Sequence, residues 1–184
     1  YEAEISSRGE KLPHYTEVGV GFSKMCLTPM LEYGRQALED NKKGVATEAL
    51  EQVVLAIVVT TAIVSIFLTR DFTPDYNSGL AHACFYALTA YPVIEKEHLH
   101  GEVVGFGVLY ALLVDGQQEE FEKIYALNKE LGLPVRIADI GITEEQFFET
   151  MDRIPQMSDI RHYPYAVTKE MLMQAYETIE QLPV

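Results

Sequence analysis

A long apolar segment without charge constrains this chain more than any other feature. From Gln52 to Thr69 no side chain is charged, and Val53 to Val59 is wholly aliphatic. Such a length is at the lower limit for a helix that crosses a bilayer. Thr60, Thr61 and Ser65 interrupt the segment, and no aromatic belt or cluster of Lys and Arg flanks it. The pattern favours a buried central helix, with a membrane-associated protein as the weaker alternative.

The rest of the chain is also patterned as helices. No pair of alternating segments is joined by an Asn-Gly or Asp-Gly hairpin turn. Thr143 with Gln146 forms a capping-box signature, and Thr168 is a suitable N-cap for the last helix. We therefore predict an all-α fold, a helix bundle that forms a single domain over residues 1–184. The predicted helices cover residues 16–40 with a break near Pro29, 46–68, 97–114 and 121–131, with others beginning near 78–79, 143 and 168.

Composition excludes several classes of protein. The chain has 184 residues, of which 48% are hydrophobic and 23% charged, so it is long and apolar enough to bury a core. A formal net charge of -14 excludes nucleic acid as a partner, because phosphates would be repelled. Cys26 and Cys84 have no C-x-x-C spacing, which argues against a disulfide framework and a thiolate zinc site. A reducing, cytoplasmic compartment is expected.

Two histidines have a context that suits metal binding. His82 lies in Gly79-Leu80-Ala81-His82-Ala83, and His100 lies in Leu99-His100-Gly101-Glu102. Neutral imidazole is a common ligand of zinc and iron, and the small residues beside both histidines allow close approach. A catalytic metal normally takes three protein ligands, and this chain offers two convincing ones.

Three residues of the preceding loop are weaker candidates for the same site. Asp71 and Asp75 are the nearby carboxylates that could complete the metal site, and Tyr76 could line a pocket wall there. Ordinary turn and packing roles explain these three residues equally well.

Neighbouring residues fit other roles. His98 precedes His100 by two positions, which on a helix places it about 200° around the axis from the same ion. Gly101, Gly105 and Gly107 do not have the order of a dinucleotide-binding fingerprint. We expect these glycines to permit close packing between helices.

Several blocks resemble the iron-containing alcohol dehydrogenases, in particular the glycerol dehydrogenase branch. The blocks are Gly79–Ala83, Leu88–Ala90, His100–Val104, Phe106–Leu109 and Gly132–Gly141, and the resemblance extends over most of the chain. It implies a two-domain enzyme in which an N-terminal α/β domain binds NAD(P) and a C-terminal helical domain holds one zinc or iron ion. This chain resembles the C-terminal domain alone, and the nucleotide-binding domain is absent from it.

The resemblance also implies roles for individual residues. His82 and His100 would be two of three metal ligands, and the third would be an aspartate of a Gly-Asp segment a few residues before Tyr1. Two departures affect the substrate. Phe85-Tyr86 stands where the glycerol enzymes usually carry His-Asn, and the segment from Val53 to His82 is longer. A related branch acting on 2-hydroxy or 2-oxo acids is therefore an alternative.

The implied parent protein is a metal- and NAD(P)-dependent alcohol or polyol dehydrogenase. Its metal would polarise the hydroxyl of a small-molecule substrate for hydride transfer, while Tyr76 would lie at the wall of the cofactor pocket. We expect a homo-oligomer without a membrane partner, and no turnover from this chain alone. The alternative of another class is a non-catalytic helical assembly module whose histidines are vestigial.

Overall fold

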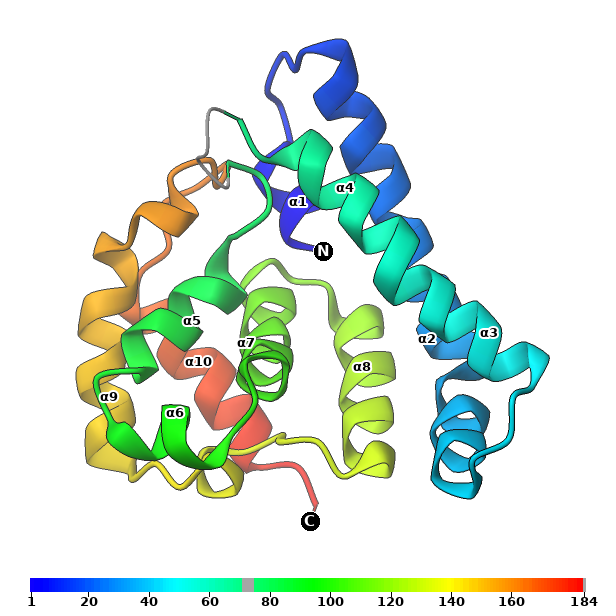
Figure 1. Ribbon diagram of the computed structural model, residues 1–184. Helices are drawn as coiled ribbons and strands as arrows, with labels where there is room; N and C mark the ends of the chain where they lie inside the picture. The colour runs from blue at the N-terminus through cyan, green and yellow to red at the C-terminus, as the bar shows by residue number, and fades with distance from the viewer. Residues whose placement is uncertain (71–74, 184) are drawn as a thin grey trace. The chain divides into compact units, whose positions relative to one another are not determined.

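All regular elements of the computed structural model are helices, as Figure 1 shows for the described residues 1–70 and 75–183. This confirms the all-α prediction. The chain divides into two compact units. One consists of Gly9–Asn77 with Tyr1 and Ala3, and the other of Ser78–Val184 with Glu2 and Glu4–Arg8. The assignment of all 184 residues to one domain stays a prediction.

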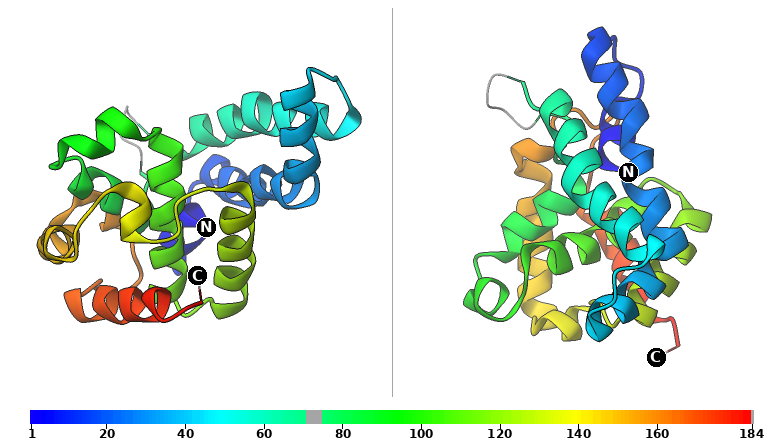
Figure 2. Two further views of the ribbon diagram at one scale, coloured as in Figure 1. Left: turned by 90° about the horizontal axis from the view of Figure 1, so that it is seen from below. Right: turned by 45° about the vertical axis from the view of Figure 1, so that its right-hand side comes forward.

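The first unit is a helical hairpin. Its first arm is α2 (His14–Lys43), and its second arm is α3 (Glu48–Leu55), the π-helical turn η1 (Ala56–Thr60) and α4 (Thr61–Leu68), which lie side by side with α2 (Figure 2). Gly44 ends α2 in the left-handed conformation at φ 67°, which glycine adopts without strain. The Thr47 hydroxyl then caps α3 by accepting from the Leu50 N–H at 3.3 Å.

α2 continues through Pro29, so the predicted break there is wrong. A proline inside a helix removes one backbone hydrogen bond and costs about 3 kcal/mol. However, α2 packs against α3, η1 and α4 of the second arm. Tertiary packing of this kind outweighs the local preference against proline.

The second arm is mostly exposed, and the predicted burial of the segment 52–69 is therefore wrong for the described residues. Over the most apolar part of Glu48–Leu68 only 11% is buried, and Val58 and Ile66 are 62% and 72% exposed. A helix that packs against one partner buries only one stripe of side chains. By length and composition this helix could cross a membrane, which by itself is weak evidence. The buried residues of the arm are Ala49, Ala56, Val64 and Leu68.

The second unit is organised around α7 (His100–Val114). This helix packs against α5 (Leu80–Leu88), α8 (Gln118–Leu131) and α10 (Lys169–Glu180), with α9 (Glu144–Arg153) beside α5 and α10 (Figure 1). The rings of Phe106 and Tyr110 on α7 pack against Phe147 of α9, with centroids 6.0 and 5.2 Å apart. The remaining elements are α1 (Glu2–Ser6), α6 (Pro92–Glu97) and the 3-10 turns η2 (Ile137–Ile140), η3 (Ile154–Gln156) and η4 (Ser158–Ile160).

Local signals placed several helix ends correctly. Gly132 ends α8 at φ 73°, the Thr143–Gln146 capping box begins α9, and the Thr168 hydroxyl accepts from the Met171 N–H at 3.3 Å. The helix predicted over residues 97–114 begins at His100 and ends at Val114, because His98 is extended between α6 and α7.

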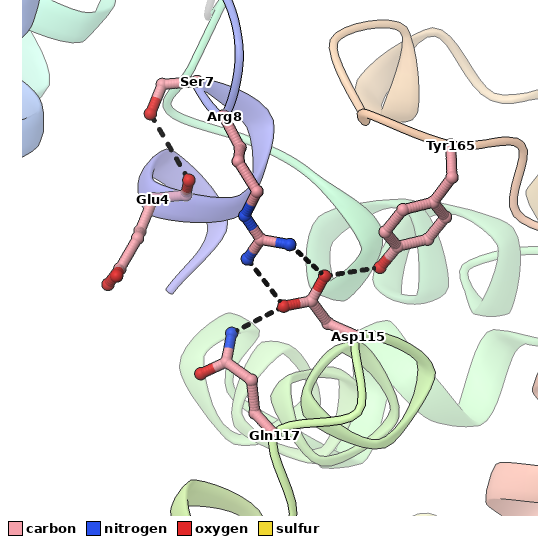
Figure 3. A network of polar contacts seen from close by, with 6 residues as sticks. All are labelled: Glu4, Ser7, Arg8, Asp115, Gln117 and Tyr165. Atoms are coloured by element: carbon pink, nitrogen blue, oxygen red, sulfur yellow. Dashed lines mark hydrogen bonds and ion pairs between the residues drawn. The ribbon is translucent and has the colours of Figure 1, made fainter.

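Asp115 joins three distant segments of the second unit (Figure 3). Its carboxylate accepts two hydrogen bonds from the Arg8 guanidinium at 2.9 and 2.8 Å, one from the Tyr165 hydroxyl at 2.8 Å and one from the Gln117 amide at 2.8 Å. The Asp115 side chain is 2% exposed, and it lies at the C-terminus of α7, where the helix dipole disfavours a negative charge. Burial raises the pKa of Asp115, but the hydrogen bonds from Arg8, Gln117 and Tyr165 lower it below its usual value.

We expect Asp115→Asn to lower the free energy of unfolding at neutral pH by about 2 kcal/mol, because it leaves the bidentate Arg8 contact without its charge. Since the folded-state pKa is lowered, the contribution is present above the unfolded pKa of about 3.9 and disappears as the pH falls through the folded value. Urea unfolding at several pH values measures this difference. Asp152→Asn, which removes an exposed ion pair with Lys169, is the control and should cost less than about 0.5 kcal/mol.

A second pair of variants tests the one-sided packing of the hairpin. Val64→Ala should cost about 2 kcal/mol, because Val64 is 5% exposed and the cavity is not refilled. Ile66→Ala on the exposed side should cost less than about 0.5 kcal/mol, helped by the helix propensity of alanine. Equal losses in urea unfolding would show that both faces of the arm are buried.

Candidate functional site

The site is built on a close contact between α5 and α7. A Cβ atom at Gly107 of α7 would lie 2.6 Å from the Ala81 carbonyl oxygen and 2.9 Å from the Ala81 Cα. No side chain fits at such distances, so the two backbones approach as closely as glycine allows. The expectation that a glycine of this helix serves close packing is confirmed at Gly107.

This contact sets two imidazole rings beside each other. His82 lies in the first turn of α5, and His100 is the first residue of α7. Their ring centroids are 5.4 Å apart at an interplanar angle of 44°. The Phe85 and His100 rings pack edge to face with their centroids 4.4 Å apart, and the centroids of the Tyr86 and His82 rings are 6.2 Å apart. The structure therefore brings together the two histidines that the sequence singled out.

Glu2 of α1 holds His82 at two points. Its Oε2 lies 2.6 Å from the Nδ1 of the His82 ring, and its Oε1 accepts a hydrogen bond from the His82 backbone N–H at 3.0 Å. Gly79, which precedes α5, has no side chain to cap the helix. A second backbone N–H of the first turn, at Leu80, donates to the Tyr163 hydroxyl at 3.2 Å. Distant side chains thus take the place of a local cap.

The two rings are electrostatically unlike. Burial lowers the pKa of His82, but the hydrogen bond to Glu2 and the charge of that carboxylate raise it above its usual value. Burial and repulsion from His82 lower the pKa of His100.

Of the other predicted site residues, two belong to the hairpin unit and one lies outside the described residues. Tyr76 is buried in the helical hairpin unit beside Ala3, Val64 and Leu68, and its hydroxyl donates to Glu10. Its assignment to a pocket wall stays a prediction. Asp75 also belongs to the hairpin unit, and Asp71 lies outside the described residues. Within residues 1–70 and 75–183 no group of three or more His, Cys, Asp and Glu side chains is arranged to hold a metal.

His98 belongs to a different surface. Its Nδ1 lies 3.6 Å from the Glu102 carboxylate, and it lines an open pocket with Lys129, Arg136 and Asp139. Neither His82 nor His100 lines that pocket. The prediction for His98 assumed one helix through His98 and His100, but His98 is extended between α6 and α7, so its exclusion from a shared ion stays a prediction.

Sequence reasoning missed Glu2 and Tyr163. Each meets the start of α5 across at least 80 positions of sequence, and no spacing rule connects residues so far apart. One signal was present. Gly79 stands where a helix usually has Ser, Thr, Asp or Asn, which means that the first N–H groups need partners from elsewhere.

Comparison with known proteins finds dehydrogenases. The chain is 31% identical to glycerol dehydrogenase of Escherichia coli O6:H1 over 131 residues, which cover 71% of this chain and 33% of that enzyme. It is 28% identical to glycerol dehydrogenase of Thermotoga maritima, and the match covers 86% of this chain and 43% of that enzyme. Hydroxycarboxylate dehydrogenase A of Escherichia coli K12 is 26% identical to this chain, and the match covers 98% of this chain and 50% of that enzyme. The chain thus spans half or less of the length of these relatives, and no protein-family model matches it.

Solved structures show the same fold. A probable glycerol dehydrogenase from Sinorhizobium meliloti 1021 superposes with a TM-score of 0.77 over 97% of this chain and 50% of that protein. The sequence identity is 22%, so this likeness concerns the fold alone. The helical arrangement is that of about half of a longer protein.

We expect Gly107→Ala to lower the free energy of unfolding by about 2 kcal/mol, because the added methyl group would overlap the Ala81 backbone. Gly105→Ala on the same helix is the matched control, since its nearest neighbour would be 4.0 Å away. That control should gain about 0.5 kcal/mol from helix propensity. Chemical unfolding of both variants checks the contact, and a stable Gly107→Ala variant would disprove it.

Proposed function

This chain is a homologue of the glycerol dehydrogenases of the iron-containing alcohol dehydrogenase family, aligned with their C-terminal half, and we propose that it forms the metal-holding helical part of an NAD(P)-dependent alcohol or polyol dehydrogenase. The observation that carries the proposal is the His82–His100 ring pair. NAD(P) would be held mainly by an α/β domain outside this chain.

The ring pair suits a divalent metal. Two imidazoles on one tetrahedral zinc, with Zn–N bonds of about 2.1 Å, bring their ring centroids to about 5.3 Å. The observed separation is 5.4 Å. Imidazole nitrogens suit zinc and iron alike, and the ligand set therefore fits either ion. The third ligand, which the family resemblance assigns to an aspartate, is not among the described residues.

Each residue of the site has a definite task in this proposal. His82 and His100 would hold the ion, which when bound supplies the Lewis acidity that polarises the substrate hydroxyl. The Glu2 carboxylate holds the Nδ1 side of the His82 ring. The Phe85 ring packs against the His100 ring with centroids 4.4 Å apart and is an apolar neighbour of the site.

The substrate class has two candidates within this proposal. Small alcohols or polyols follow from the similarity to glycerol dehydrogenases, and 2-hydroxy acids follow from the similarity to hydroxycarboxylate dehydrogenase A. Phe85 and Tyr86 lie beside the two histidines and are the residues expected to decide between them. An exchange of Phe85-Tyr86 for His-Asn in the parent enzyme should shift preference towards glycerol.

A helical assembly module is the second candidate function. The exposed apolar side of the arm Glu48–Leu68, with Val58 and Ile66, favours it because contiguous apolar surface marks interaction sites. Metal content that is unchanged in histidine variants, together with a changed oligomer size in a variant of this face, would favour the module over the enzyme.

We expect the chain to bind Zn²⁺ and His82→Ala and His100→Ala each to weaken that binding at least about tenfold. Isothermal titration with ZnCl₂ measures the affinity directly. His98→Ala, which leaves the ring pair intact, is the control and should bind as the original chain does. Equal affinity in all four proteins would refute the metal site.

A further inference from the structure

We propose that Glu2 is a positioning residue for His82, whose carboxylate fixes the proton on Nδ1 and so leaves Nε2 as the nitrogen available to a metal. This inference rests on the proposed function for its role, while the contact itself is independent of any ion. It concerns a carboxylate that sequence reasoning did not find.

The two Glu2 oxygens have separate partners. Oε1 accepts from the backbone N–H of His82 at 3.0 Å, and Oε2 lies 2.6 Å from Nδ1 of the same residue. The first contact holds the carboxylate against the helix, and the second holds the ring against the carboxylate. A carboxylate that contacts both the ring and the backbone of one histidine fixes the orientation of that ring.

The geometry makes Glu2 a partner of the ring and not a ligand of the ion. Its Oε2 is already at hydrogen-bond distance from Nδ1, and Glu2, His82 and His100 do not form a group able to hold a metal among the described residues. An ionised carboxylate only accepts hydrogen bonds, so Nδ1 must carry the proton. The neutral ring then has its lone pair on Nε2, which is the form that coordinates zinc or iron.

The surroundings support a built contact. The side chains of Glu2 and His82 are 13% and 21% exposed, and a carboxylate so far buried requires compensating donors. Gly79 leaves room for it, because a Cβ there would lie 3.2 Å from the Glu2 Cβ and 3.3 Å from Oε1. A side chain at position 79 would therefore press on the carboxylate that holds the ring.

Glu2→Gln separates positioning from helix capping. The glutamine side chain has one oxygen and one NH₂ group. When the oxygen takes the position of Oε1, it still accepts from the His82 backbone N–H, and the NH₂ group then faces Nδ1. Nδ1 must then accept, and the ring proton moves to Nε2. We expect Zn²⁺ affinity to fall at least about tenfold, which is the usual size of effects from residues that orient a ligand.

Tyr163→Phe is the matched control. It removes the acceptor of the Leu80 N–H on the same helix turn and leaves the ring contact untouched. It should lower stability without changing Zn²⁺ affinity by more than about twofold. An equal loss of affinity in Tyr163→Phe and Glu2→Gln would show that Glu2 acts only through the stability of α5, and would overturn the proposal.

The tautomer is measured without metal. Two-bond ¹H–¹⁵N spectra of the metal-free chain, at a pH where the ring is neutral, report which His82 nitrogen is protonated. We expect Nδ1–H in the original chain and Nε2–H in Glu2→Gln. An unchanged tautomer overturns the inference. Failure of the original chain to bind Zn²⁺ refutes the proposed function instead, and leaves the tautomer result to decide the role of Glu2.

Discussion

The approach of α7 to α5 at Gly107 is the constraint on which the site depends. One helix carries His82 and the other begins with His100, so the distance between their backbones sets the distance between the rings. Protein interiors are packed too densely to absorb an added methyl group at a backbone contact. Phe106 and Tyr110, which flank Gly107 on α7, pack against Phe147 of α9 and hold the same helix in the core.

The fold was predictable from the sequence where local chemistry determines it. Thr143, Thr168 and Gly132 act within one turn of their own positions, and their roles could be identified without knowing any partner. Pro29 and the apolar arm could not be interpreted in this way. Whether α2 tolerates the proline, and whether Val58 is covered, depends on which helix lies alongside, and that is a tertiary property.

The site residues also fall into two groups, those that local sequence identifies and those that only tertiary contacts identify. His82 and His100 stand in short blocks that could be recognised from their neighbours and from a family resemblance. Glu2 gives no such sign, because its contact with His82 is made in three dimensions and its neighbours in sequence are unremarkable. The clue lay in what α5 lacks, a capping side chain at Gly79, and not in any residue that could be picked out for its chemistry.

The way in which α5 is capped has a consequence for the order of folding. Its first N–H groups are satisfied by Glu2, 80 positions earlier, and by Tyr163, 83 positions later. Closing loops of this size carries an entropic cost before any contact forms. We therefore expect the turn that carries His82 to become ordered late in folding, whereas α8 and α9 carry their own end signals. The hydrogen exchange of the first α5 amides should accordingly report the completion of the tertiary structure.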